Sequence, residues 1–202
     1  MPAAQEPVVG IVSARQGEGW RVDIGAAHQA SLDGLAFEGA SRRNRPNLKV
    51  RSSYIEQVPN ANINQINALV YARVSLAHKD MEPELECFDA QTRKTEGFGE
   101  LKGGFLVRCS LKMSRKCVIL SITTALAHRE YRSLLDPNYF FLPLLGSRFP
   151  LDAAVGTNGR VWISAKEVKQ TIAAARCIEA ADPDGGGMDQ NALKKFIGTL
   201  DL

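Results

Sequence analysis

Short apolar runs separated by glycine-containing turns characterise the first part of the chain. Residues 8–12 form an uncharged run, and residues 20–24 alternate between apolar and polar side chains before Gly25. A period of two is typical of a strand that buries one face, because successive side chains point to opposite sides. The segments predicted as strands are residues 8–12, 20–24, 30–37, 68–76 and 84–88. Several short strands without a long helical repeat predict a small β-barrel of the OB type over residues 1–96.

The second part of the chain, residues 97–202, mixes strand and helix patterns. Residues 103–111 favour a strand, and residues 134–145 are apolar enough for a buried helix limited by two prolines. Two apolar runs then flank the sequence Gly-Thr-Asn-Gly at residues 156–159. An Asn-Gly pair in this setting predicts a β-hairpin, because both residues tolerate a positive φ angle.

Two helices are predicted after this hairpin. Ser164 and Glu167 have the spacing of a capping box, which places the start of the first helix at Ser164. Apolar positions at helical spacing continue to Glu179, and a glycine-rich segment at residues 182–187 ends the helix. Asp189 is the expected cap of a last helix. The order strand, helix, hairpin, helix predicts a mixed α+β fold, with two small domains in the whole chain.

Composition narrows the function classes. The 202 residues carry a formal net charge of +3, so nucleic-acid binding cannot be inferred from the total charge. The chain has no secretory pattern at its start, and no uncharged apolar run reaches the roughly 18 residues of a membrane span. Its four cysteines and three histidines are scattered singly. We therefore predict no metal site, no cofactor and no membrane contact, and expect a reduced, intracellular chain.

A basic segment follows the third predicted strand. Arg42, Arg43, Arg45 and Lys49 lie close together, and no acidic residue separates them. Arginine contacts phosphate through two parallel hydrogen bonds and stays charged at every physiological pH. Loops of OB barrels commonly bind oligonucleotides, so these four residues are candidate RNA contacts. A solvated loop, or one that docks on an acidic protein, is the alternative.

A second basic group lies at the start of the second domain. Arg108 and Lys112 are an even number of residues apart, so on a strand they would share one face and extend a groove for the RNA backbone. A solvated sheet face is the favoured alternative.

Two further groups of side chains could bind ligands, but a purely structural role is preferred for each. Four aromatic residues could stack on bases but are expected in the barrel core: Trp20, Phe37, Tyr71 and Phe88. Glu82, Glu84 and Glu86 would share a strand face and could hold a metal ion for a nuclease. The sequence offers them no histidine or distant acidic partner, so a solvated strand edge is favoured and no catalytic residue is predicted.

Three short segments together resemble one protein family. They are F-E-G-A-S-R-R-N-R-P-N at residues 37–47, K-D-M-E-P-E-L at 79–85 and G-T-N-G-R-V-W at 156–162. In this order they resemble the exosome component three family, cap subunits of the eukaryotic RNA exosome, and the last segment is similar to that family's G-x-N-G signature.

The resemblance implies a ribosomal-S-one-type OB barrel at residues 1–96 and a KH-like domain at residues 97–202. A family member sits on a ring of RNase-PH-like proteins beside other cap subunits. It guides single-stranded RNA to a 3′-to-5′ exonuclease in rRNA processing and RNA decay, without chemistry of its own. The nucleus, nucleolus and cytoplasm are the expected locations. Two alternatives stay open: an assembly module that docks on proteins without touching RNA, and a free-standing barrel-KH regulator of RNA.

The chain departs from the family pattern in three places. The family has a further N-terminal domain, which is expected to be missing here because the barrel pattern begins near Met1. Residues 51–68 interrupt the barrel pattern, and residues 117–132 interrupt the KH pattern. Both segments are interpreted as insertions.

The glycine motif of the second domain has two interpretations. In ordinary KH domains a GXXG loop between two helices clamps the nucleic-acid backbone. In this chain the flanks are predicted strands, so a structural role is expected for Gly156, Asn158 and Gly159, and the resemblance implies burial at the interface between the domains. Arg160, next to the turn, remains a candidate RNA contact.

Overall fold

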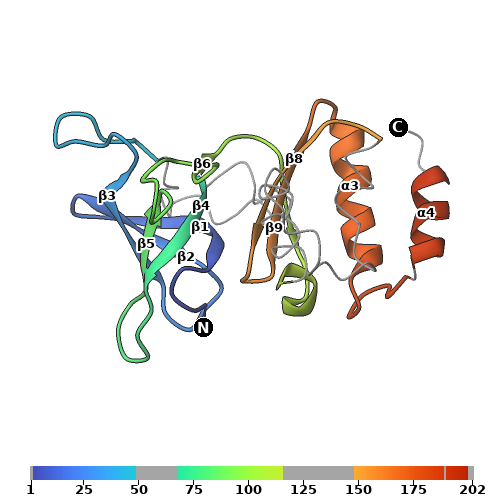
Figure 1. Cartoon of the computed structure of the whole chain (residues 1–202), viewed down its shortest axis with the longest axis horizontal. Coiled ribbons are helices and arrows are strands. Elements are labelled where there is room, and N and C mark those ends of the chain that lie inside the picture. Colours follow the sequence, from blue (N-terminus) through green and yellow to red (C-terminus); the bar gives the residue numbers. More distant parts are fainter. Residues whose placement is uncertain (1, 49–67, 116–147, 189, 200–202) are drawn as a thin grey trace, which may run out of the picture. The chain divides into compact units, whose positions relative to one another are not determined.

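The structure, a computed structural model, describes residues 2–48, 68–115, 148–188 and 190–199. It divides into two compact units, Met1–Gly103 and Gly104–Leu202, which Figure 1 shows coloured along the chain. The helix predicted at residues 134–145, the cap at Asp189 and most of the two predicted insertions lie outside the described residues.

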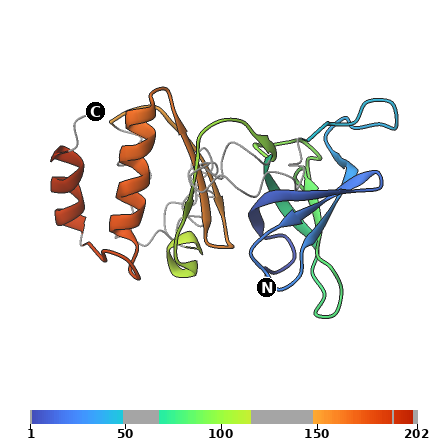
Figure 2. The same ribbon diagram turned by 180° about the vertical axis from the view of Figure 1, so that it is seen from behind.

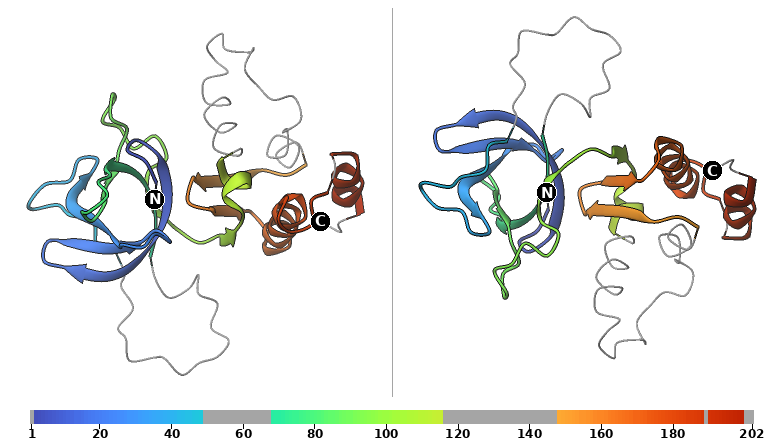
Figure 3. Two further views of the ribbon diagram at one scale, coloured as in Figure 1. Left: turned by 90° about the horizontal axis from the view of Figure 1, so that it is seen from below. Right: turned by 90° about the horizontal axis from the view of Figure 1, so that it is seen from above.

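The described part of the first unit is a mixed six-stranded sheet, with antiparallel and parallel pairs, that closes on itself as a barrel. Its strands are β1 (Pro7–Gln16), β2 (Gly19–Asp23), β3 (Ala30–Phe37), β4 (Leu69–Leu76), β5 (Glu84–Cys87) and β6 (Gly99–Leu101). The strand order is β1-β2-β3-β5-β4-β6, and an additional pairing of β1 with β4 closes the barrel. The left view of Figure 3 shows these strands as a ring. The OB-type barrel predicted from the alternating pattern is confirmed.

Alternation along the strands fills the interior of the barrel. In β3 the buried positions alternate with solvent-facing ones, and Leu32 is completely buried. Val22 on β2 and Val74 on β4 are also completely buried, and burial of each such side chain contributes about 1.5–3 kcal/mol. Gly10 interrupts the apolar run of β1 because a Cβ atom there would lie 2.2 Å from a methyl group of Val22. The closest packing between β1 and β2 therefore requires glycine.

The boundary between the two units differs from the predicted one. The sequence patterns placed it after residue 96, whereas β6 pairs with β4 through Leu101 and Leu69 and so belongs to the barrel. A strand of three residues is too short for its alternation to be recognised. The barrel unit therefore extends to Gly103.

The second unit packs helices on a three-stranded antiparallel sheet. Its strands are β7 (Phe105–Arg108), β8 (Leu151–Gly156) and β9 (Arg160–Ala165), in the order β7-β9-β8. Helix α3 (Val168–Ala181) lies between this sheet and helix α4 (Gln190–Thr199) (Figure 2). Val155, Ile163 and Ile178 belong to the core cluster that joins the sheet to α3. The mixed α+β fold is confirmed. Among the described residues no helix is long and apolar enough to span a membrane.

The predicted hairpin is present, but asparagine does not have the predicted conformation. Gly156 pairs with Arg160, which leaves a three-residue loop between β8 and β9. Gly159 has a φ angle of +74°, while Asn158 is not among the described non-glycine residues with positive φ. A three-residue hairpin loop needs the left-handed conformation only at its last residue. Glycine at position 159 therefore meets the requirement alone.

The capping box predicted at the start of α3 is not formed. Ser164 lies in β9, where it pairs with Asp152 of β8, and α3 begins at Val168 with Glu167 as its N-cap. Thr171 makes the side-chain hydrogen bonds at the start of α3 instead. Its hydroxyl accepts a hydrogen bond from the amide of Ala165 and donates one to the carbonyl of Glu167. Strand pairing keeps Ser164 extended and overrides the local helix signal.

The buried face of α3 also differs from the one that the spacing suggested. Of the apolar positions in the predicted pattern, Val168 and Ile172 are 75% and 50% exposed, whereas Ala175 and Ile178 are buried. The buried residues are Ala173, Ala174, Ala175, Cys177 and Ile178. Small alanine side chains carry little hydrophobic signal but permit close packing of α3 on the sheet, which explains why only the C-terminal part of the buried face was recognised.

Candidate nucleic-acid interface

Arg42 and Arg43 form the tip of a closed turn in the loop after β3. The amide of Ser41 donates to the carbonyl of Asn44 at 2.9 Å, and the amide of Asn44 donates back to the carbonyl of Ser41 at 3.1 Å. The hydroxyl of Ser41 accepts a second bond from the amide of Asn44 at 3.1 Å. These bonds hold the backbone while both arginine side chains are exposed. The turn thus presents two adjacent guanidinium groups to solvent.

Arg45 has a different role in the same loop. Its guanidinium group forms an ion pair with Glu18 at 2.9 Å, and the Arg45 side chain is only 23% exposed. The Cδ atom of Arg45 lies close to Gly34, 3.4 Å from where a Cβ would stand. Leu48, at the end of the described loop, is buried in the barrel core. Arg45 and Leu48 therefore anchor the loop to the barrel, and the charge of Arg45 is largely compensated.

Lys49, the fourth residue of the predicted basic group, lies outside the described residues.

A second loop, between β5 and β6, is tied to the basic loop. The amide of Thr95 donates to a carboxylate oxygen of Glu38 at 2.6 Å. Within the second loop, Asp89 accepts hydrogen bonds from the amides of Gln91 and Thr92 at 2.9 and 3.0 Å. These bonds, led by that from Thr92, hold the pKa of the Asp89 carboxyl below its usual value. Each loop therefore has its own internal hydrogen bonds, and the bond between Thr95 and Glu38 joins the two loops.

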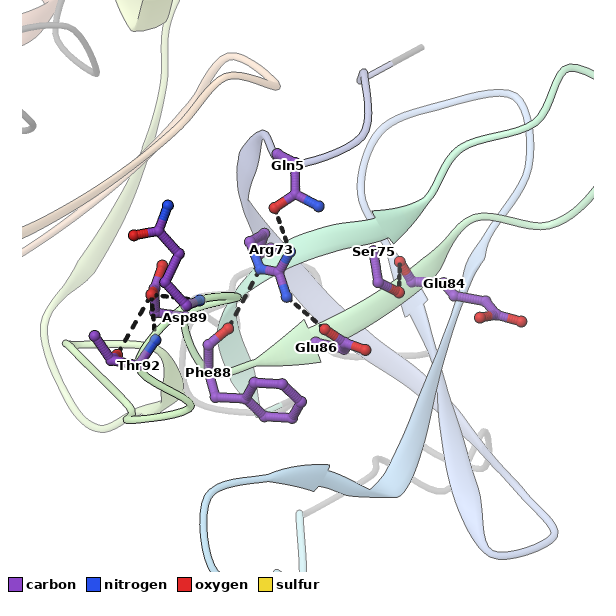
Figure 4. A network of polar contacts seen from close by, with 9 residues as sticks. Gln5, Arg73, Ser75, Glu84, Glu86, Phe88, Asp89 and Thr92 are labelled. Atoms are coloured by element: carbon purple, nitrogen blue, oxygen red, sulfur yellow. Dashed lines mark hydrogen bonds and ion pairs between the residues drawn. The ribbon is translucent and has the colours of Figure 1, made fainter.

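Arg73 fastens the base of the second loop to the barrel. The guanidinium group lies between Gln5, Glu86 and the carbonyl of Phe88, and bonds to all three (Figure 4). Arg73 is only 5% exposed, and the carboxylate of Glu86 compensates its buried charge. Because Phe88 directly precedes Asp89, this network sets the direction in which the loop leaves β5.

A hollow of about 410 Å³ lies between the two loops. Phe37 and Phe98 contribute aromatic surface to it, and Asn44, Arg45 and Lys102 contribute polar groups. The ring of Phe98 stacks on Tyr71 with centroids 4.8 Å apart. Burial raises the pKa of Tyr71 to about 12.

Of the other predicted stacking residues, Trp20 belongs to the barrel core. It is 4% exposed and meets Phe37 edge to face, with centroids 6.0 Å apart. The core interpretation of Trp20 is confirmed, whereas Phe37 is only partly buried. Phe98, which sequence patterns did not single out, is the additional aromatic residue of this region. Phe98 was not recognised from the sequence because the glycines on either side of it suggested a turn.

The second basic group does not have the predicted arrangement. Arg108 ends β7 and is exposed, but Lys112 lies in the helical residues 111–115. The two side chains therefore do not share a strand face. The amide of Met113 donates to the hydroxyl of Ser110, which caps this helix, and the amide of Ser110 donates to Asp182 at 2.6 Å. A serine cap thus ends the strand earlier than the apolar pattern suggested.

The turn at residues 156–159 packs against neighbouring backbone. The amide of Cys109 donates to the carbonyl of Gly159 at 2.9 Å, and the amide of Gly159 donates to the hydroxyl of Ser114. A Cβ atom at position 159 would lie 2.8 Å from the carbonyl oxygen of Cys109. Gly156 is buried, and Arg160 is only 6% exposed. Arg160 is therefore buried, unlike Arg42 and Arg43, and its RNA contact stays a prediction.

Comparison with known proteins matches both units to domain families. A family model described as the S1 domain of exosome complex component RRP40 matches residues 1–64 and 56–99. A KH domain model matches residues 104–169. The exosome complex component rrp40 of Schizosaccharomyces pombe is 43% identical over 172 residues, which are 85% of this chain and 58% of that protein. The chain belongs to the RRP40 family of exosome components.

Other RRP40 proteins give the same result. The Drosophila melanogaster protein is 37% identical over 92% of this chain and 65% of its own length. The Homo sapiens protein is 33% identical over 90% of this chain and 54% of its own length. This RRP40-family chain thus spans a little over half to about two thirds of the length of these relatives. A crystal structure provisionally described as an exosome complex RNA-binding protein shares the fold, with a TM-score of 0.63, 18% identity, and coverage of 99% of this chain and 94% of that one.

The acidic segment of this RRP40-family barrel is occupied by arginine contacts. Glu86 pairs with Arg73, and Glu82 lies 3.6 Å from Arg21. Among the residues that the structure describes, no three histidine, cysteine, aspartate or glutamate side chains are grouped as metal ligands. Two of the three glutamates of this segment thus contact arginine side chains.

Proposed function

We propose that this chain is a non-catalytic RNA-binding cap subunit of the RNA exosome, which guides single-stranded RNA to the 3′-to-5′ exonuclease for rRNA processing and RNA decay. The observation that carries the proposal is the closed turn that exposes Arg42 and Arg43 on an S1-type barrel. Two exposed guanidinium groups on a rigid backbone suit the phosphates of a flexible strand. Lys49, Arg108 and Lys112 are further proposed contacts.

The proposed partners follow from the family. They are the RNase-PH-like ring subunits and the other cap subunits of the exosome, and the proposed locations are the nucleus, the nucleolus and the cytoplasm. Family membership supports assembly with exosome proteins. The exposed turn supports RNA contact, because Arg42 and Arg43 are exposed whereas Arg45 pairs with Glu18.

The salt dependence of RNA binding tests the proposal. The double substitution Arg42→Ala with Arg43→Ala should weaken binding of a single-stranded oligoribonucleotide to the full chain. Each lost phosphate contact lowers the slope of log affinity against log salt by about 0.7 for single strands, so the double change should lower it by about 1.4. Fluorescence anisotropy over a series of potassium chloride concentrations measures this slope.

A matched control uses two exposed lysines near the start of α3. Lys166→Ala with Lys169→Ala removes the same net charge from another exposed site, and the slope should change little. Equal slopes for both double variants would show that Arg42 and Arg43 do not contact RNA. Crosslinking in the assembled complex then separates the docking alternative, in which adducts on residues 42–43 join protein rather than RNA.

A further inference from the structure

The two aromatic rings of the hollow are held in place by the barrel. Phe98 stacks on Tyr71 at an interplanar angle of 23°, and Phe37 meets Trp20 at 84°. Both phenylalanines pack against the barrel core yet remain partly exposed. A ring supported on one side and accessible on the other loses little conformational freedom when a planar ligand stacks on it. Such rings are the usual platforms for unpaired bases.

Polar groups around these rings match the remaining parts of a nucleotide. Asn44 lines the hollow and closes the turn that exposes Arg42 and Arg43. Lys102, directly after β6, also lines the hollow and its side chain is 84% exposed. Its Nζ lies 3.9 Å from Glu100, an ion pair that is worth little in water. Glu38 and Glu100 also line the hollow, and Glu38 is engaged by the amide of Thr95. The flanking phosphates of a base seated between the loops would therefore meet Lys102 on one side and the turn that carries Arg42 and Arg43 on the other.

One buried donor beside the hollow is also unsatisfied. Arg45 lines the hollow, and its Nε–H is buried without a hydrogen-bond acceptor among the described residues. A buried donor without an acceptor is costly, and most such groups in proteins have a partner. Because the Nε–H itself is buried, an oxygen of a base or phosphate would satisfy it only after a shift of the Arg45 side chain toward the hollow.

The face that OB barrels generally use for oligonucleotides has a different character in this chain. OB domains bind chiefly on the outer face of their second and third strands. The side chains there that are not buried are polar or aliphatic except for Phe37 at the end of β3: Arg21, Asp23, Ser31, Asp33, Leu35 and Phe37. Arg21 is also engaged by Gln16 at 2.6 Å and lies near Glu82. The one aromatic residue of this face, Phe37, lies where β3 ends and lines the hollow.

We propose that the hollow between residues 37–46 and 95–102 holds one unpaired base of single-stranded RNA, stacked on Phe98 and Phe37. Its volume is near the lower end of the roughly 300–1,000 Å³ typical of ligand pockets, which suits a single nucleotide. The bond between Glu38 and Thr95 positions the two walls. This inference rests on the proposed RNA-binding function and adds a base-holding subsite to the phosphate contacts of Arg42 and Arg43.

The decisive variant is Phe98→Leu in the full chain, because leucine keeps apolar packing on Tyr71 but removes the flat ring. Base–aromatic stacking contributes about 1–3 kcal/mol, so affinity for an oligouridine should fall about tenfold. Affinity for the matching abasic oligonucleotide, and the salt slope, should not change. The control is Phe105→Leu, an exposed phenylalanine of the second unit at 40% exposure, which should leave both affinities unchanged.

A measurement on the unaltered protein covers the case in which Phe98→Leu lowers barrel stability. Photocrosslinking with an oligonucleotide that carries 5-iodouridine should give adducts on Phe98 or Phe37. Adducts only on Arg21, Ser31, Asp33 or Leu35 of β2 and β3 would overturn the base site.

The outcomes separate the two proposals. Suppose that Arg42→Ala with Arg43→Ala lowers the salt slope as expected, while Phe98→Leu leaves the RNA affinity unchanged and no adduct forms in the hollow. This result refutes the base site and leaves the phosphate contacts standing. Absence of any RNA binding by the unaltered chain refutes both.

Discussion

Two tight turns of this protein have arginine in the turn or directly after it, but the arginines have opposite environments. The turn at residues 41–44 closes through its own backbone and exposes Arg42 and Arg43. The turn at residues 156–159 bonds to Cys109 and Ser114, and the arginine that follows it is buried. The difference shows that the residue types of a turn do not by themselves create a ligand contact. What packs against the turn decides whether its cations reach solvent.

The largest expected effect is at the packed turn. Gly159→Ala places a side chain at a φ angle of +74° and only 2.8 Å from the carbonyl of Cys109. A left-handed conformation costs a non-glycine residue about 1–3 kcal/mol, and the close contact adds to that. Unfolding in denaturant should show a loss of about 3 kcal/mol in the second unit.

Gly39→Ala is the matched control for this prediction. Gly39 has a similar φ angle of +67°, but no atom lies within 4 Å of a Cβ placed there. Only the conformational cost, about 1 kcal/mol, is then expected. Equal losses for both substitutions would mean that the contact with Cys109 does not restrict position 159.

The next effect contrasts the arginines of the two turns. Arg160→Ala removes a side chain that is 6% exposed and should lower the free energy of unfolding by about 1–3 kcal/mol. Arg42→Ala with Arg43→Ala should change it by less than about 0.5 kcal/mol per residue, because both are exposed. Thermal unfolding of the three proteins compares them. An unstable double variant, or an unaffected Arg160→Ala, would contradict the distinction between exposed and buried turn arginines.

A smaller effect concerns the arginine that pairs with Glu18. Glu18→Gln removes the carboxylate that compensates Arg45. Because Glu18 itself is largely exposed, the ion pair is worth about 0–1 kcal/mol to stability. RNA affinity should nonetheless rise a few-fold, and the salt slope should steepen by up to about 0.7 as one more cation becomes available. Anisotropy titrations measure both. Weaker binding would show that Glu18 positions the loop for RNA.

The smallest expected effect is a pH dependence in the second unit. Burial alone would raise the pKa of Asp182, but hydrogen bonds from Ser110 and Asp184 outweigh it and hold the pKa below its usual value. A lowered pKa in the folded state means that its stabilisation is present above about pH 3.9, the unfolded value, and is lost as the pH falls through the folded value. Unfolding measured from pH 6 downward should show this loss below about pH 4. Asp182→Asn should reduce it, and an equal pH dependence in that variant would assign the loss to other carboxyls.

Local patterns predicted those features that depend on a few neighbouring residues. The barrel was recognised because apolar and polar residues alternate in β2 and β3. The β8–β9 hairpin was recognised from its glycine turn. The exposed basic loop was recognised because its arginines have no acidic neighbours in the sequence.

Features that depend on distant residues were not predictable from these patterns. Arg45 is compensated by Glu18, which lies 27 positions earlier. Ser164 had a good capping signal but is held extended by Asp152 on β8. Phe98 became part of a candidate site only because β6 pairs with β4 and brings its ring onto Tyr71.

The sequence by itself determined that this chain forms a small barrel and an α+β unit, and that it carries a cluster of arginines after the third strand. Periodicity and charge spacing are local, so they survive without knowledge of the fold. Only the tertiary structure decided which arginines face solvent, which are paired and which are buried. That outcome depends on the strands, loops and helix ends that packing brings beside each turn.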